Sequence, residues 1–216
     1  MKKRKYKTII WDWNGTLIDD AWLAIEVMND MLTRRKMKTI TLDLYREIFD
    51  FPVKDYYAKI GYDFSVESFE VVGNEFITLY DERHFECNLR LSAMKCLEKF
   101  KNANMNQYIL SARNHKQLEE EIQHFNISSH FKTYSGLSHN YAHGKIELGK
   151  ELIDNENIFV ETTVLIGDTT HDFEVAQSLG IDCILLEGGH HSQKRLKDCG
   201  VILFEELDQL TGIIDE

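Results

Sequence analysis

Short apolar runs that alternate with helical patterns constrain the fold of this 216-residue chain more than any other feature. The runs are rich in β-branched, leucine or aromatic residues, as buried strands are. They cover residues 7–11, 105–111, 163–168, 182–186 and 201–204. Apolar periodicity predicts helices over residues 115–125, 145–153 and 171–179. Because strands that alternate with helices usually pair in parallel, the sequence predicts an α/β fold with a doubly wound, Rossmann-like parallel sheet.

The segment 19–88 shows no such strand pattern. Apolar residues recur at helical spacing from Trp22 to Leu32, after Asp19 and Asp20, which are candidate helix caps. Further helical patterns cover residues 42–49, 56–60 and 69–80. We therefore predict an all-helical cap domain, residues 19–88, inserted into an α/β core formed by residues 1–18 and 89–216.

Charge and composition exclude several classes of partner. The chain has 25 Lys and Arg against 36 Asp and Glu, a net charge of −11, which disfavours binding to a nucleic-acid backbone. A small anionic substrate remains compatible with this charge. No apolar run reaches the roughly 18 residues of a membrane span, so no membrane partner is expected. The four cysteines lack C-x-x-C spacing, which favours reduced thiols and a cytoplasmic location.

Polar residues stand at the ends of three predicted strands, where ligands bind in open α/β sheets. They are Asp12-Trp13-Asn14-Gly15-Thr16, Ser111 and Gly167-Asp168-Thr169-Thr170-His171-Asp172. Asp168 and Asp172 lie four residues apart across a strand-to-helix turn, so both carboxylates can face one cation. Carboxylate oxygens with retained waters suit Mg²⁺. The pattern therefore predicts a magnesium site at this edge of the sheet.

The order and spacing of these segments, with Lys145 between the second and the third, resemble the haloacid dehalogenase-like (HAD) hydrolase superfamily, in particular its phosphoglycolate-phosphatase-like branch. In that family the motifs are D-x-D-x-T, a strand-end Ser or Thr, a Lys, and a G-D-x-x-x-D type segment. The stretch between Asp12 and Ser111 leaves room for the family's helical cap. The shorter stretch from Ser111 to Lys145 does not hold its other, larger cap.

The resemblance implies a role for each catalytic and metal-binding position. Asp12 would be the nucleophile that forms an aspartyl-phosphate, Ser111 would donate a hydrogen bond to the phosphoryl group, and Lys145 would supply positive charge. Mg²⁺ would be held by Asp12, Asp168 and the backbone carbonyl of Asn14. A further carboxylate, Asp172, would support the metal.

Four further residues are expected to contact substrate. The backbone of Gly15 and Thr16 follows the nucleophile, where amides can face anionic oxygens. Arg113, two residues beyond Ser111, is a candidate anion ligand. We therefore expect a magnesium-dependent phosphatase of a small phosphorylated metabolite, with phosphoglycolate as the first candidate by resemblance. Lys54, the fourth residue, belongs to an alternative reaction considered next. The oligomeric state cannot be derived from one sequence.

One departure from the family pattern bears on mechanism. The family's second aspartate is its general acid and base, and here it is Asn14. An amide does not exchange a proton at neutral pH, and losing a positioned acid or base costs about 10²–10⁴-fold in rate. Deamidation of the Asn14-Gly15 dipeptide would restore the acid.

Three alternatives follow from Asn14. The enzyme is slow, or acts on substrates whose leaving group needs little protonation. Alternatively, it cleaves C–P bonds as phosphonoacetaldehyde hydrolases do, with Lys54 of the cap forming an imine. The third alternative is a binding or regulatory relative without turnover.

Two other features near the motifs have structural interpretations. Thr169 and Thr170 are expected to cap the following helix. His190 and His191 follow Gly188-Gly189 after a strand and are interpreted as part of a flexible loop, with approach to the site as the alternative.

Overall fold

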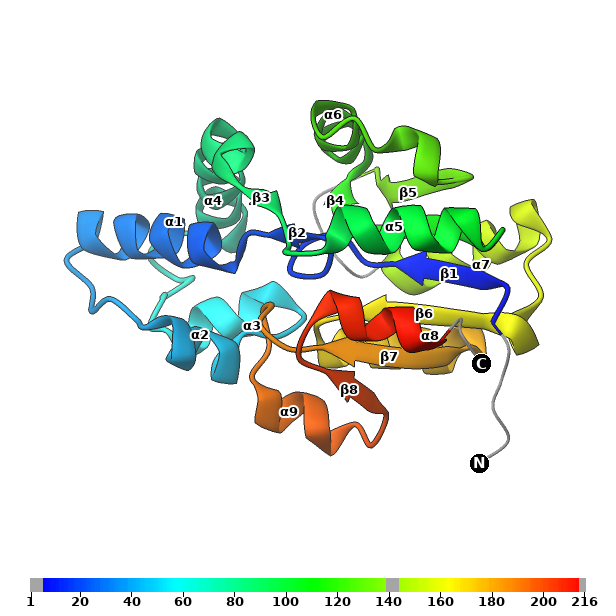
Figure 1. Ribbon diagram of the computed structural model, residues 1–216. Helices are drawn as coiled ribbons and strands as arrows, with labels where there is room; N and C mark the ends of the chain where they lie inside the picture. The colour runs from blue at the N-terminus through cyan, green and yellow to red at the C-terminus, as the bar shows by residue number, and fades with distance from the viewer. Residues whose placement is uncertain (1–5, 139–143, 214–216) are drawn as a thin grey trace.

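Six parallel strands form the central sheet of the computed structural model, which describes residues 6–138 and 144–213 (Figure 1). The strand order is β5-β4-β1-β6-β7-β8. The strands are β1 (Thr8–Trp11), β4 (Asn106–Asn114), β5 (Thr133–Leu137), β6 (Thr163–Gly167), β7 (Asp182–Leu186) and β8 (Ile202–Phe204). The predicted Rossmann-like α/β core is confirmed.

Strand β1 is central because both of its faces and both of its edges are covered. All four of its residues are buried, and it pairs with β4 on one side and β6 on the other. Ile9 and Trp11 belong to one hydrophobic cluster, and Ile10 belongs to the other. This alternation is the period of two expected of a strand covered on both faces.

Helices cover both faces of the sheet. On the side of Ile9 and Trp11, the apolar faces of two helices and a C-terminal 3₁₀ helix complete the core: α5 (Ala93–Asn102), α6 (His115–His124) and η5 (Leu207–Ile213). On the side of Ile10 lie α7 (Lys145–Glu156) and α8 (Thr170–Leu179). A short helix, α9 (Gln193–Asp198), connects β7 and β8.

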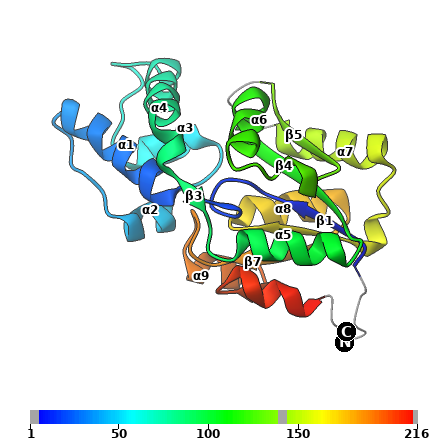
Figure 2. The ribbon, with the colours of Figure 1, turned by 45° about the horizontal axis from the view of Figure 1, so that its top comes forward.

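The cap consists of α1 (Ala21–Arg34), α2 (Leu42–Ile48), α3 (Val53–Lys59) and α4 (Phe69–Arg83). These helices lie together at one end of the molecule, as Figure 2 shows. The chain leaves and re-enters the core through β2 (Ile18–Asp19) and β3 (Asn88–Leu89), which pair antiparallel. All four helices fall within the segment 19–88 that the sequence analysis proposes as the cap.

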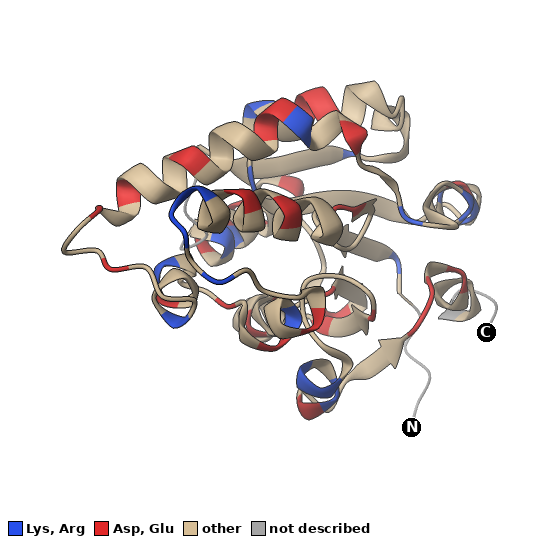
Figure 3. Cartoon of the chain, turned by 90° about the vertical axis from the view of Figure 1, so that its left-hand side faces the viewer, with Lys and Arg blue, Asp and Glu red and all other residues tan. Residues whose placement is uncertain are grey.

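The surface of the cap carries both charges. Acidic and basic residues are interspersed along the helices that face the viewer in Figure 3. Among the residues described, no helix combines the length and apolar character needed to cross a membrane.

Candidate active site

The polar residues predicted at the strand ends meet at one edge of the sheet, beneath the cap. Asp12 follows β1, Ser111 lies within β4, and Asp168 follows β6. A cavity of about 230 Å³ lies between this edge and the cap helices, and Asp12, Ser111, Lys145 and Asp172 line its core side. Parallel strands bring their carboxyl ends to one edge, which is why residues far apart in sequence share this cavity.

Three carboxylates and one ammonium form the floor of the site. Oxygen atoms of Asp12, Asp168 and Asp172 lie within 4.8 Å of one another, and all three residues are buried. Lys145 Nζ donates to Asp12 Oδ1 and to Asp172 Oδ1, each at 2.6 Å. Burial raises the pKa of Asp12 to about 8, although Lys145 opposes the shift, and burial also raises the pKa of Asp168. An excess of buried carboxylates with hard oxygen donors fits a divalent cation such as Mg²⁺.

Hydrogen bonds at the first turn of α8 fix the orientation of the Asp172 carboxylate. Thr169 is the N-cap, as expected, and its Oγ1 accepts a hydrogen bond from Asp172 N at 3.2 Å. In return, Asp172 Oδ2 accepts from Thr169 N at 3.0 Å and from Asp168 N at 3.2 Å. This capping box leaves Asp172 Oδ1 directed at Lys145, so Asp172 orients the lysine.

Asp168 is held by two loops that close around it. Its Oδ1 accepts from Thr16 Oγ1 and its Oδ2 from His190 N, both at 2.7 Å. Two glycines let these loops approach. A Cβ atom on Gly15 would lie 2.3 Å from Asp168 Oδ2, and one on Gly189 would lie 2.1 Å from the same atom. Both positions therefore exclude a side chain.

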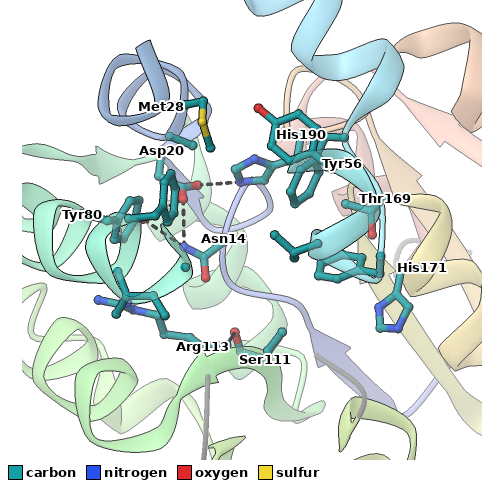
Figure 4. Close-up of a pocket in the computed structure, with 18 of the residues that line it drawn as sticks. Asn14, Asp20, Met28, Tyr56, Tyr80, Ser111, Arg113, Thr169, His171 and His190 are labelled. Carbon is teal, nitrogen blue, oxygen red and sulfur yellow. Dashed lines mark hydrogen bonds and ion pairs between the residues drawn. The ribbon is translucent and has the colours of Figure 1, made fainter. Parts of the chain in front are cut away.

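Asn14 belongs to a buried network centred on Asp20 (Figure 4). Asn14 Nδ2 donates to Asp20 Oδ2 at 2.8 Å and to Tyr80 Oη at 3.1 Å. Asp20 also accepts from Tyr80 Oη and from Gly15 N, each at 2.7 Å. His190 Nε2 lies 3.2 Å from Asp20 Oδ1. Burial opposes a charge on His190, but the Asp20 carboxylate raises the pKa of the imidazole to about 9, so His190 is protonated at neutral pH.

Comparison with known protein families identifies the family to which this chain belongs. Residues 9–186 match the family described as haloacid dehalogenase-like hydrolase, which is most of the chain. The chain belongs to the haloacid dehalogenase-like hydrolase family. A curated relative of this chain, a 5'-nucleotidase from Pseudomonas aeruginosa, is 25% identical over 201 residues, which cover 89% of this chain and 88% of the relative.

Solved structures show the same fold at lower identity. A haloacid dehalogenase-like family hydrolase from Streptococcus pneumoniae superposes with a TM-score of 0.82 at 18% identity, covering 96% of this chain and 98% of that one. Protein tyrosine kinase A from Mycobacterium tuberculosis gives a TM-score of 0.82 at 19% identity and covers each chain completely. The fold is therefore shared between proteins of different names, and function must be argued from the site.

Within this hydrolase site, Asp20 and His190 line the cavity, although the sequence favoured a helix cap for Asp20 and a flexible loop for His190. Asp20 precedes α1, but its side chain makes no capping hydrogen bond and turns into the cavity instead. His190 and His191 are buried rather than part of a flexible loop. The pair Gly188-Gly189 was the one available signal, since glycines permit the close approach that buries these histidines.

Three residues expected to contact substrate lie elsewhere in the structure. Gly15 and Thr16 do not line the cavity. The Gly15 amide donates to Asp20 Oδ1 and the Thr16 amide to Trp13 O, so both amides are already bonded within the protein. Lys54 is exposed on α3, with Nζ 5.5 Å from the centre of the Phe64 ring. The structure therefore gives no support to the alternative of an imine-forming cap lysine.

Arg113 lines the cavity, but its guanidinium is engaged in ion pairs. Nη2 lies 2.7 Å from Asp81 Oδ1 and 2.8 Å from Glu121 Oε1, and Nε donates to Glu121 Oε1 at 2.9 Å. Glu121 is fully buried and also accepts from Trp13 Nε1. Arg113 therefore neutralises Glu121 rather than offering a free charge to an anion.

Replacing Arg113 by Met is expected to lower the free energy of unfolding by about 3 kcal/mol, because Glu121 is left buried without its cation. Urea denaturation measures the change, and the double variant Arg113→Met/Glu121→Gln should recover part of the loss. A variant of unchanged stability with a raised KM for substrate would instead assign Arg113 to substrate binding.

Replacing Gly189 by Ala is expected to lower the free energy of unfolding by about 1–3 kcal/mol, since the added Cβ overlaps Asp168. Gly73→Ala is the matched control. An added Cβ at Gly73 meets the Phe69 ring at 3.8 Å, which is ordinary contact. Alanine favours a helix interior by about 0.5–1 kcal/mol over glycine, so this control should be stabilised. Equal melting temperatures for the two variants would contradict the packing argument.

Proposed function

We propose that this protein is a magnesium-dependent phosphatase that acts on a small phosphorylated metabolite through an aspartyl-phosphate on Asp12. The observation that carries the proposal is the buried cluster of Asp12, Asp168 and Asp172, with Lys145 bonded to Asp12 and Asp172, beside a cavity that is large enough for a small ester. Family membership and the 5'-nucleotidase relative support the same class of reaction.

Each residue at the base of the cavity has a separate role in the proposed phosphoryl transfer. Asp12 would attack phosphorus in line, and Lys145 beside it would stabilise charge on the phosphoryl oxygens. Ser111 Oγ accepts a hydrogen bond from Arg113 N at 3.0 Å, which leaves the hydroxyl hydrogen for a phosphoryl oxygen. When bound by Asp12, Asp168 and the Asn14 carbonyl, with Asp172 in support, Mg²⁺ would supply further charge neutralisation.

A binding protein without turnover is the second candidate, and Asn14 is the observation that favours it. The Asn14 amide lies where the family has its acid, and Asp20 and Tyr80 hold its nitrogen. An acyl phosphate separates the two candidates. Its leaving group is a carboxylate that needs no proton, so a phosphatase lacking an acid should still hydrolyse it.

The experiment measures inorganic phosphate released from acetyl phosphate, with Mg²⁺ and after metal removal by a chelator. We expect release with Mg²⁺ and a fall of at least about 10²-fold without it, because neither Lys145 nor Ser111 replaces the charge of a divalent cation. Readdition of Mg²⁺ should restore the rate. An equal rate of phosphate release with and without the chelator would contradict metal dependence. No release above the protein-free rate would favour the binding protein.

A further inference from the structure

The cap side of the cavity differs in character from its floor, and this difference bears on the substrate class of the proposed phosphatase. Among the described residues that line the cavity, those from the cap segment are apolar or aromatic apart from Asp20. The rings that line it include Phe49, Phe51, Tyr56, Phe69 and Phe76. Figure 4 shows Met28, Tyr56 and Tyr80 on the cap side of Asn14.

The rings of this wall support one another. The Phe49 ring centre lies 5.4 Å from that of Phe51 and 5.4 Å from that of Tyr56, both near perpendicular. Phe76 stacks on Tyr80 with 6.0 Å between centres. Such edge-to-face and stacked contacts favour a further ring placed against them. The wall is therefore suited to a planar, uncharged group.

Charges at the cavity argue against a second anionic group on the substrate. Lys145 is bonded to Asp12 and Asp172, and Arg113 is paired with Glu121 and Asp81. The described lining residues of the cap segment include no Lys or Arg. His190, which also lines the cavity, is paired with Asp20. A carboxylate such as that of phosphoglycolate would enter the apolar cap wall, at a cost in desolvation.

The size of the cavity matches a single ring with its phosphoryl group. Its volume is about 230 Å³. An apolar cavity of about 150 Å³ accommodates benzene, which leaves room here for the phosphoryl group above the cavity floor. Gly73 lies inside α4 and lines the cavity, although its surroundings would accept a methyl group. The absence of a side chain at this helix position leaves space in the cavity, although glycine is unfavourable within a helix.

The chemistry of Asn14 selects the leaving group. With an amide in place of the acid, the oxygen that departs from phosphorus must leave without a proton. A phenol, whose pKa of about 10 is that of the tyrosine side chain, departs as phenolate far more easily than an aliphatic alcohol does. A ring bonded directly to the ester oxygen therefore satisfies both the aromatic wall and the missing acid.

Resting on the phosphatase function proposed above, we propose that the substrates are small aryl phosphates, the phosphate monoesters of uncharged phenols. An oxygen of Asp12 forms a bond to phosphorus as the bond from phosphorus to the phenolic oxygen breaks. The electron pair leaves with the phenolate, which takes its proton from solvent. Water then attacks phosphorus and gives its proton to solvent, and the bond to Asp12 breaks with its electron pair returning to the carboxylate, so that phosphate is released.

Three esters separate the contributions of ring and leaving group. Phenyl phosphate has the ring and the acidic leaving group, and benzyl phosphate has the ring but an aliphatic alcohol. Phosphoglycolate has neither and carries a second anion. We expect kcat/KM for phenyl phosphate to exceed that for each of the others at least about 10²-fold, the lower bound for a missing acid. Acetyl phosphate reports phosphatase activity without a ring.

A variant at Gly73 tests where the ring binds. Gly73→Leu places a side chain in the cavity, and it should lower the ratio of kcat/KM for phenyl phosphate to that for acetyl phosphate at least tenfold. Phe76→Ala, which removes one ring of the wall, should lower the same ratio. Gly212→Leu is the matched control, because Gly212 is exposed, lies outside the cavity and has no atom within 4 Å of an added Cβ. Thermal unfolding confirms that each variant is folded.

The outcomes separate this inference from the proposed function. A preference for phenyl phosphate that Gly73→Leu reduces and Gly212→Leu preserves supports the aryl phosphate class. Turnover of acetyl phosphate with benzyl phosphate or phosphoglycolate within tenfold of phenyl phosphate overturns the inference and leaves the phosphatase standing. An unchanged ratio in Gly73→Leu and Phe76→Ala also overturns it. No release from acetyl phosphate or from any of the three esters in the presence of Mg²⁺ refutes the phosphatase function and this inference with it.

Discussion

Replacing Asp12 by Asn is expected to lower phosphate release on the order of 10⁴-fold or more, the largest effect predicted for this site. The amide oxygen is too weak a nucleophile to attack phosphorus, and no other described carboxylate of the cluster takes its place. Asp172 is fixed by its capping box, and Asp168 is held by Thr16 and His190. The rate of phosphate release under saturating acetyl phosphate measures the loss.

The same variant should stay folded, which separates catalysis from stability. Burial raises the pKa of Asp12 to about 8, so in the metal-free protein its ionised form is destabilising at neutral pH. An amide removes that cost while Lys145 keeps its bond to Asp172. We therefore expect the melting temperature in chelator at pH 7 to equal or exceed that of the wild type. The exposed Asp198→Asn is the control. Activity within tenfold of wild type would exclude Asp12 as the nucleophile.

Most of the fold was predictable because the buried strands have apolar sequences. Residues 182–186 were expected as a strand and form β7 over the same residues, since a strand buried between helices must be apolar. The edge strand β5 was missed. Its sequence, Thr-Tyr-Ser-Gly-Leu, is covered on only one edge by β4, and three of its five residues are partly exposed, so it lacks an apolar run. Edge strands tolerate polar residues that central strands exclude.

The residues of the candidate site also fall into those that the sequence predicted and those that it did not. Residues at the ends of apolar strands, such as Asp12 and Asp168, could be placed because the strand fixes where the next residue points. Asp20 and His190 could not, because 170 positions separate them and their contact arises only when the cap segment meets the loop after β7. For Arg113 the error is the opposite one, since the sequence suggested a ligand-binding role that its ion pairs do not support. Its position near Ser111 suggested an anion ligand, but Glu121, one helix further on, already neutralises it.

Exchanging the two side chains in the double variant Asn14→Asp/Asp20→Asn is expected to raise kcat/KM for benzyl phosphate by about 10²–10⁴-fold, the value of a positioned acid. The exchange keeps one carboxylate and one amide, which in the wild type are joined by the hydrogen bond of 2.8 Å from Asn14 Nδ2 to Asp20 Oδ2. Gly15 N and Tyr80 retain partners on the new amide. Phenyl phosphate should gain less, because its leaving group needs less protonation.

The single variant Asn14→Asp is the informative comparison. It places two carboxylates where the wild type has a hydrogen bond, so the pair must share a proton or repel. We expect its free energy of unfolding to fall by about 1–3 kcal/mol and its gain on benzyl phosphate to stay below that of the double variant. Urea denaturation and initial rates with both esters measure the two effects. A single variant as stable and as active as the double would mean that Asp20 does not constrain position 14, and a double variant without gain would mean that the wild type already has an acid from another residue.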